Sequence, residues 1–168
     1  MSLKKTSDTV AISFDIDESA LNTFTQSQIN LTLDPLNNEV FVVLGVDLDV
    51  AAPSFLPGQN TQSTMALTTT SKTSMPSIGD SQCLARVQSK IQTGLSADSG
   101  VGFMHASPDT PIGLLDYIGI IATNNMFVQI QGGNNAGSIN GAGRVWGYRA
   151  RADASVYGAL VQSEVLSA

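Results

Sequence analysis

The segment 39–52, EVFVVLGVDLDVAA, constrains the fold of this chain more strongly than any other. From Val40 to Val50 every second residue is valine or leucine, so one face stays apolar from end to end. On the other face, apolar residues in the first half give way to Asp47 and Asp49 in the second. Because successive side chains of a strand point to opposite sides, this pattern predicts a strand that begins covered on both sides and ends with one side in water. Such strands are typical of proteins built from two packed sheets.

The same alternation, with a period of two residues, recurs along the chain and predicts further strands. The segments that show it are 10–17, 29–33, 64–73, 117–122, 126–131 and 145–153. The segment 83–95 fits a helix or a strand, and we favour a strand because its neighbours are strands. For 156–166 the periodicity does not decide between a strand and a helical turn. With about seven or eight strands and no convincing long helix, the chain is predicted to be all-β, an antiparallel sandwich or barrel.

Turn residues between these segments predict how the strands are connected. Asp34-Pro35 followed by Asn37-Asn38 predicts a turn, so that the strands on either side form a hairpin. Asn124-Asn125 predicts a second hairpin between its two flanking strands. The segment 53–63, with its prolines and glycine, is predicted to be a surface connection. The Gly/Asn-rich segment 132–143 is predicted to be a long mobile loop.

Two of the predicted strands also carry predictions about which side chains reach solvent. The threonine-rich segment 64–73 is expected to expose one of its faces. In the last predicted strand, Trp146 and Tyr148 alternate with Arg149 and Arg151. We expect the aromatic side chains to face the core and the arginines to form a basic edge, available to solvent or to an acidic neighbouring subunit.

Length and charge limit the class of protein. A chain of 168 residues is predicted to form a single domain, 1–168, with a sizeable core. Its net charge of −6 argues against strong direct binding to nucleic acid, which requires clustered lysine and arginine. No apolar stretch reaches the roughly 20 residues of a membrane span, and residues 1–20 lack the apolar core of a signal peptide, so we expect synthesis in a cytosol. Cys83 is the only cysteine, which excludes an internal disulfide.

One short motif suggests enzyme chemistry. Asp15-Ile16-Asp17, at the end of an apolar strand, resembles the DxD motif of phosphotransferases of the haloacid dehalogenase type, in which one Asp is the nucleophile and Mg²⁺ lies between the two. That family continues with Gly-Thr and with helices on a parallel sheet, whereas Glu18-Ser19 follow here. A function has to be argued from a whole site, so we interpret the pair as a solvated strand face.

Four carboxylates suggest a metal site. If the strands that carry Asp15, Asp17, Asp47 and Asp49 lie side by side, their oxygens form a cluster of the kind that suits Ca²⁺. Unpaired carboxylates that face water explain the same residues. The sequence leaves both interpretations open, and a calcium-dependent rise in melting temperature would support the first.

The remaining motifs argue against a catalytic site. His105 is the only histidine, so neither a His-rich zinc or iron site nor the metal ligands of a cupin can be built. No G-x-S-x-G sequence accompanies it, and we interpret it as a loop histidine. The segment 132–143 contains no G-K-[ST] and is not a phosphate-binding loop. We therefore predict that the protein is not an enzyme, that it uses no cofactor, and that it has no catalytic, cofactor-binding or metal-binding residue.

The order of these elements resembles that of single jelly-roll capsid proteins from icosahedral viruses. The resemblance is carried by LDPLNNEVFVVLGVDLDVAAP at 33–53, by MFVQIQGG at 126–133, and by GRVWGYRARAD at 143–153 after the Gly/Asn-rich segment. It implies an antiparallel β-sandwich of about eight strands, of jelly-roll type, whose loops and edges make subunit contacts in a closed shell. The implied location is the virion, after synthesis in the host cytoplasm.

The same resemblance implies which partners the protein has. They are copies of itself and other capsid proteins. Unlike many such proteins, this chain lacks an Arg-rich N-terminal arm, which better suits a shell around an internal membrane or a separately packaged genome. The competing interpretations are a carbohydrate- or ligand-binding β-sandwich module, which would use the loops 53–63 and 132–143, and a small hydrolase built on the acidic strand ends.

Overall fold

The structure is a computed structural model that describes residues 3–94, 100–106 and 115–166. The strands of these residues are β1 Leu3–Lys5, β2 Val10–Asp17, β3 Thr25–Asn30, β4 Glu39–Val50, β5 Thr61–Thr68, β6 Cys83–Thr93, β7 Gly100–Ala106, β8 Gly119–Ile121, β9 Asn125–Gly133 and β10 Asn140–Ala152. A 3-10 helix, η1 Pro35–Asn37, precedes β4, and an α-helix, α1 Ala154–Leu166, follows β10. The segment 83–95, for which we favoured a strand, is β6 up to Thr93.

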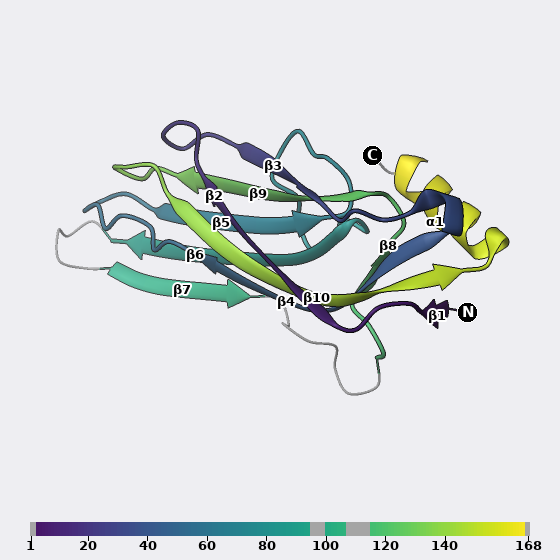
Figure 1. Ribbon diagram of the computed structural model, residues 1–168. Helices are drawn as coiled ribbons and strands as arrows, with labels where there is room; N and C mark the ends of the chain where they lie inside the picture. The colour runs from purple at the N-terminus through teal and green to yellow at the C-terminus, as the bar shows by residue number, and fades with distance from the viewer. Residues whose placement is uncertain (1–2, 95–99, 107–114, 167–168) are drawn as a thin grey trace.

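The strands form two antiparallel five-stranded sheets that pack face to face (Figure 1). In sheet A, β10 lies between β2 and β4, and β8 pairs with the far side of β4. The short β1 pairs with the last residues of β10, along the same edge of β10 that β2 follows. Sheet A is therefore only four strand positions wide. Sheet B has five positions in the order β3-β9-β5-β6-β7.

The strand order identifies the fold as a jelly roll. We number the eight strands other than β1 and β7 from one to eight in chain order. Sheet A then has the order 1-8-3-6, and sheet B has the order 2-7-4-5. This order results when a chain alternates between two sheets and closes two Greek keys, which defines the jelly roll. The predicted class, an antiparallel β-sandwich of about eight strands and jelly-roll type, is confirmed.

The main core lies between the two sheets. Its buried side chains come from alternate positions of the paired strands, as the period-two pattern requires. Phe41 of β4, Met65 of β5, Ile130 of β9 and Val145 of β10 are fully buried there. Among the described residues, no side chain of β7 belongs to this core.

Strand β4 contains a β-bulge. Its alternate valines face a second, smaller core before the bulge and the main core after it. β10 pairs with β4 through Trp146 to Gly45 and Gly147 to Val43, so that Leu44 has no partner. An extra residue reverses which side chains face inward. Before the bulge Val42 lies on the outer face of sheet A, and after it the alternate valines lie in the main core.

The bulge corrects one prediction and leaves another intact. The expectation that one face stays apolar from Val40 to Val50 is wrong, because the two ends of this series face opposite sides of the sheet. The expectation that the strand begins covered on both sides and ends with one side in water is confirmed. Residues 40–43 are fully buried, whereas Asp47 and Asp49 are exposed.

The outer face of β4 is covered by α1, which occupies the segment whose structure the periodicity left open (Figure 1). Asp153 caps the helix, and its Oδ1 accepts a hydrogen bond of 2.9 Å from the backbone N–H of Val156. This contact, followed by the side chain of Ser155, holds the pKa of Asp153 below its usual value. Leu160 is among the helix side chains that pack on the outer face of sheet A.

The two predicted hairpins are wrong, although their turn residues are correct. Asp34 caps η1 with its side chain, and Asn38 adopts the left-handed conformation with φ of 52°. The turn nevertheless leads from β3 in sheet B to β4 in sheet A. Likewise β8 lies in sheet A and β9 in sheet B, so the turn at Asn124-Asn125 crosses between sheets. Turn residues mark a chain reversal but do not specify which sheet the next strand joins.

Gly147 tests the bulge directly. A β-carbon at this position would collide with the backbone oxygen of Val42 and lie 2.6 Å from Cε1 of Phe41. Gly147→Ala should therefore lower the free energy of unfolding by about 1–3 kcal/mol, the usual cost of overpacking. Urea unfolding followed by circular dichroism measures the change. The matched control is Gly137→Ala, where a β-carbon meets nothing within 4 Å. Equal unfolding midpoints for the two variants would contradict the bulge geometry.

Candidate functional site

The structure does not bring the four aspartates together. Asp15 of β2 and Asp49 of β4 both pair with Ala142 of β10, from opposite edges of that strand. Two strand spacings separate them, which is about 10 Å. Asp17 lies opposite Asn140, and Asp47 lies opposite Arg144.

Within the described ranges, no three His, Cys, Asp or Glu side chains are grouped to hold a metal ion. The carboxylates of Asp15, Asp17, Asp47 and Asp49 are exposed on the outer face of sheet A. The strand that carries Asp15-Ile16-Asp17 is an edge strand of an antiparallel sheet and not the parallel strand of a phosphotransferase.

A shallow hollow of about 350 Å³ lies beside these aspartates. Its lining includes Asp47, Asp49 and Trp146. Trp146 was predicted to face the core, and this is wrong, because the neighbouring Val145 occupies the inward position. The guanidinium of Arg144 lies 5.9 Å from the Trp146 ring centre, and its Nε donates a hydrogen bond of 3.1 Å to the Ser13 hydroxyl.

The two arginines of the predicted basic edge contact their own chain. Nη2 of Arg149 donates to the backbone oxygen of Leu31 and to Oγ1 of Thr32, each at 2.9 Å. Arg151 donates to Oδ1 of Asn37 at 3.0 Å. Arg149 therefore links β10 to the end of β3, and Arg151 links β10 to η1. Tyr148, also predicted to face the core, lies in the smaller cluster under α1.

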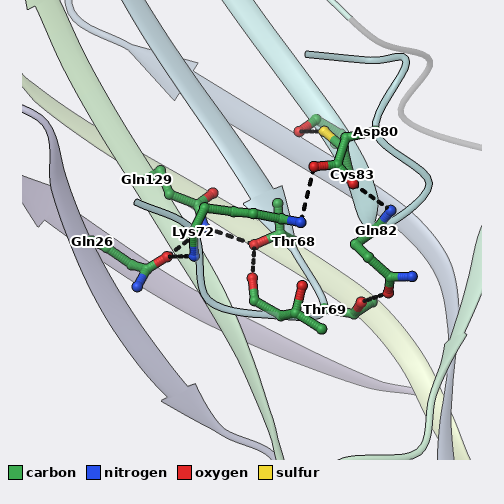
Figure 2. Close-up of polar contacts among 10 residues, drawn as sticks. Gln26, Thr68, Thr69, Lys72, Asp80, Gln82, Cys83 and Gln129 are labelled. Atoms are coloured by element: carbon green, nitrogen blue, oxygen red, sulfur yellow. Dashed lines mark hydrogen bonds and ion pairs between the residues drawn. The ribbon is translucent and has the colours of Figure 1, made fainter. Parts of the chain in front are cut away.

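The outer face of sheet B carries a polar network that also buries the small residues of β5. Gln129 is fully buried, and its Nε2 donates to Oε1 of Gln26 at 3.0 Å and to Oγ1 of Thr68 at 2.6 Å (Figure 2). The predicted exposure of one face of 64–73 is therefore wrong for β5, where even Ala66 on the outer face is fully buried. Longer neighbouring side chains and the connection after β5 cover these small residues.

An ion pair closes the connection from 69 to 82 on itself, and a backbone hydrogen bond attaches the connection to this face. Nζ of Lys72 lies 2.9 Å from Oδ2 of Asp80 (Figure 2), and the Lys72 backbone N–H donates to Gln26 at 2.8 Å. The hydrogen bond from Lys72, followed by one from the backbone of Gln82, lowers the pKa of Asp80. Next to it, burial raises the pKa of the Cys83 thiol, which disfavours its thiolate form.

Strand β7, at one edge of sheet B, has exposed apolar side chains. In β7, Val101, Phe103 and Met104 are 58%, 53% and 71% exposed. β7 ends sheet B, and of the described residues only β6 pairs with it. His105 lies in this strand opposite Gln88, so its interpretation as a loop residue is wrong. A second hollow, of about 330 Å³, follows β6 and β7 and includes Phe103 and His105.

The edge formed by β7 lacks the features that usually protect exposed edges. Natural edge strands carry lysine, proline or a bulge that prevents pairing with another chain. The sequence of β7, GVGFMHA, has no lysine, arginine, aspartate, glutamate or proline. Its pairing with β6 is continuous from Gly100 to Ala106. This strand is the strongest candidate for an interaction surface.

Two buried glutamates were not foreseen from the sequence. Glu18 accepts hydrogen bonds from the backbone N–H groups of Gly132 at 2.5 Å and Ile139 at 2.9 Å. It thereby fixes the turn between β9 and β10, so the predicted mobile loop at 132–143 is reduced to six residues between ordered strands. Glu164 of α1 accepts from the backbone N–H groups of Ala122 at 2.8 Å and its neighbour at 3.0 Å, and so anchors the helix to the end of β8.

No family model and no curated protein matches this chain. A solved structure from Desmodium yellow mottle tymovirus is similar to it, with a TM-score of 0.33 and 11% sequence identity. The match covers 88% of this chain and 91% of that one. The fold assignment rests on the strand order and not on this likeness. In the part of the chain that the structure describes, no helix is long and apolar enough to cross a membrane.

The Asp80 ion pair predicts a pH dependence. Because the folded pKa of Asp80 lies below its ordinary value of 3.8, the pair stabilises the fold above that pH and loses its effect as the pH falls through the folded pKa. Asp80→Asn should lower the free energy of unfolding by less than about 1 kcal/mol near neutral pH, since the pair is partly exposed.

Urea unfolding at several pH values measures this difference. The gap between wild type and Asp80→Asn should close below about pH 3.8, and Lys72→Met should behave in the same way because it breaks the same pair. A gap of constant size from neutral to acid pH would show that the ion pair does not stabilise the connection.

Proposed function

We propose that this chain is a viral structural protein, a capsid subunit that assembles with copies of itself into an icosahedral shell. Two features support the proposal together. The strand pattern of the sequence resembles single jelly-roll capsid proteins, and the sheets have the jelly-roll order. Many jelly rolls have other functions, so the fold alone is insufficient support.

The observation that carries the proposal is the unprotected edge at β7. A protein that works as a monomer exposes few contiguous apolar side chains and protects its sheet edges. Here one edge strand has three apolar side chains that are more than half exposed, Val101 and Phe103 on its outer face and Met104 on its inner face. A subunit whose edges are covered by its neighbours in a shell does not need such protection.

The surface charge is consistent with assembly by weak contacts. Only 13% of the residues are charged, and the net charge is −6. Subunits of this charge repel one another weakly, and salt screens that repulsion. Many small contacts then give a stable shell, because each subunit is held by several neighbours.

The proposal includes the partners and location expected for such a subunit. The partners are copies of this chain and other capsid proteins, with no strong direct binding to nucleic acid. An internal membrane or a separately packaged genome would fill the shell. The protein would be made in the host cytoplasm and reside in the virion, and it would need no catalysis or cofactor.

Assembly of the purified protein tests the proposal. Light scattering and electron microscopy at increasing protein and salt concentrations should reveal large regular particles, because salt screens the repulsion between acidic subunits. Phe103→Lys should reduce particle yield at least about tenfold, since a charge on an edge strand blocks strand pairing. The control Ile78→Lys changes a residue that is 58% exposed in the connection after β5, and should assemble normally. A protein that stays monomeric under all conditions contradicts the proposal.

The hollow beside Trp146 favours a second candidate, a carbohydrate- or ligand-binding module. Aromatic rings and carboxylates together suit sugar recognition, the ring contacting the apolar face of the sugar and the carboxylates accepting from its hydroxyls. The hollow combines Trp146 with Asp47 and Asp49. If this candidate is correct, the wild-type protein binds glycans on an array as a monomer, and Trp146→Ala loses at least about tenfold in affinity. Absence of any glycan binding contradicts it.

A further inference from the structure

We propose that the first contact in assembly is a two-fold dimer in which β7 pairs antiparallel with β7 of a second copy, with Phe103 directly opposite its own counterpart. This inference rests on the proposed self-assembly and specifies its geometry. The pair would join two five-stranded sheets into one continuous sheet of ten strands. The occupant of the β7 edge is therefore a second copy of this chain.

Symmetry limits which registers are possible. A two-fold axis that relates two antiparallel edge strands is perpendicular to the sheet, so each residue and its copy point to the same face. Residues directly opposite each other must also point to the same face. Both conditions hold only when some residue lies opposite its own copy. A register centred between two residues is excluded.

The length of β7 then selects the central residue. The strand runs from Gly100 to Ala106, and Phe103 is its middle residue. Centring the pair on Phe103 is the only register that pairs the whole strand. It places Val101 opposite His105 and Gly102 opposite Met104.

This register is complementary in size and places no like charges opposite each other. On the outer face the two Phe103 rings are neighbours, at a separation where aromatic pairs attract. On the inner face the long Met104 side chain of each copy lies over Gly102, which has no side chain to obstruct it. No charged pair is opposed, since the nearest lysine, Lys90, lies on β6 opposite Phe103. Three strand spacings, about 14 Å, separate the two Lys90 residues, which exceeds the screening length at physiological salt.

The architecture of the sandwich leaves room for the second copy. Sheet B has five strand positions and sheet A has four, so β7 has no strand of sheet A opposite it. The outer face of β7 is open as well, since Val101 and Phe103 are more than half exposed there. Among the described residues, only β6 pairs with β7, so its other edge is available to a second β7.

Two single-cysteine variants test the register. In a Cys83→Ser background, Phe103→Cys places the two thiols on directly opposed residues, with Cα atoms about 4.5–5.5 Å apart, which a disulfide can span. Val101→Cys is the matched control on the same strand and the same face, 58% exposed against 53%. Its two copies are offset by four residues, about 14 Å, which a disulfide cannot span.

We expect mild oxidation to give at least about ten times more covalent dimer with Phe103→Cys than with Val101→Cys. Circular dichroism of the reduced variants confirms that both are folded, and separation of the dimer by non-reducing electrophoresis quantifies the yield. Equal yields from the two variants, or dimer from Val101→Cys alone, would overturn the register.

The outcome also separates this inference from the proposed function. If the wild-type protein forms regular particles and Phe103→Cys gives no covalent dimer, the β7 pair is wrong and self-assembly stands. If the wild-type protein stays monomeric at every concentration and Phe103→Cys gives no dimer, both are wrong.

Discussion

The contact between the inward apolar faces of two sheets of unequal width determines the rest of this structure. Sheet A supplies four strand positions and sheet B five, so the main core is closed at β6 and β7 projects beyond it. Burial of apolar side chains between the sheets is the dominant stabilising contribution in such a sandwich. The same packing that stabilises the domain therefore leaves one strand with apolar side chains and no sheet to cover them. Met104, on the inner face of β7, is exposed because the sandwich ends before it reaches this side chain.

The bulge at Leu44 allows one pair of strands to serve two cores. After the bulge, β4 and β10 bury Val46 and Val145 against sheet B. Before it, the outer face of the same strands packs against α1, whose position is fixed by the hydrogen bonds from the end of β8 to Glu164. The outer face of sheet A is thus divided between a helix-covered end and an acidic, hydrated end with Asp47.

Local patterns in the sequence predicted the sandwich and most of its strands, because burial on one side imposes a period of two on each strand. The bulge could not be predicted from the sequence, because the apolar series from Val40 to Val50 is unbroken. Only the shift in the pairing register of β4 with β10, after Trp146, reveals it. The sequence also could not show which sheet each strand joins. The caps at Asp34 and Asn38 have the same form whether the turn connects two strands of one sheet or two strands of different sheets. The helix α1 also escaped prediction, because most of its residues are exposed and its apolar residues do not follow one clear stripe. The apolar edge was missed as well, because no strand was predicted at 100–106, and only the structure places β7 at the end of sheet B.

The central claim is that β7 is the surface through which copies of this chain associate. Amide hydrogen exchange, measured by mass spectrometry on the assembled and the dissociated protein, tests it most directly. The account predicts that outward-facing amides of 100–106 exchange at least about tenfold more slowly in the assembled form, because they donate to a neighbouring strand, while β10 changes little because both of its edges are already paired. Unchanged exchange in β7, with new protection at another surface such as β3 or α1, would contradict the account.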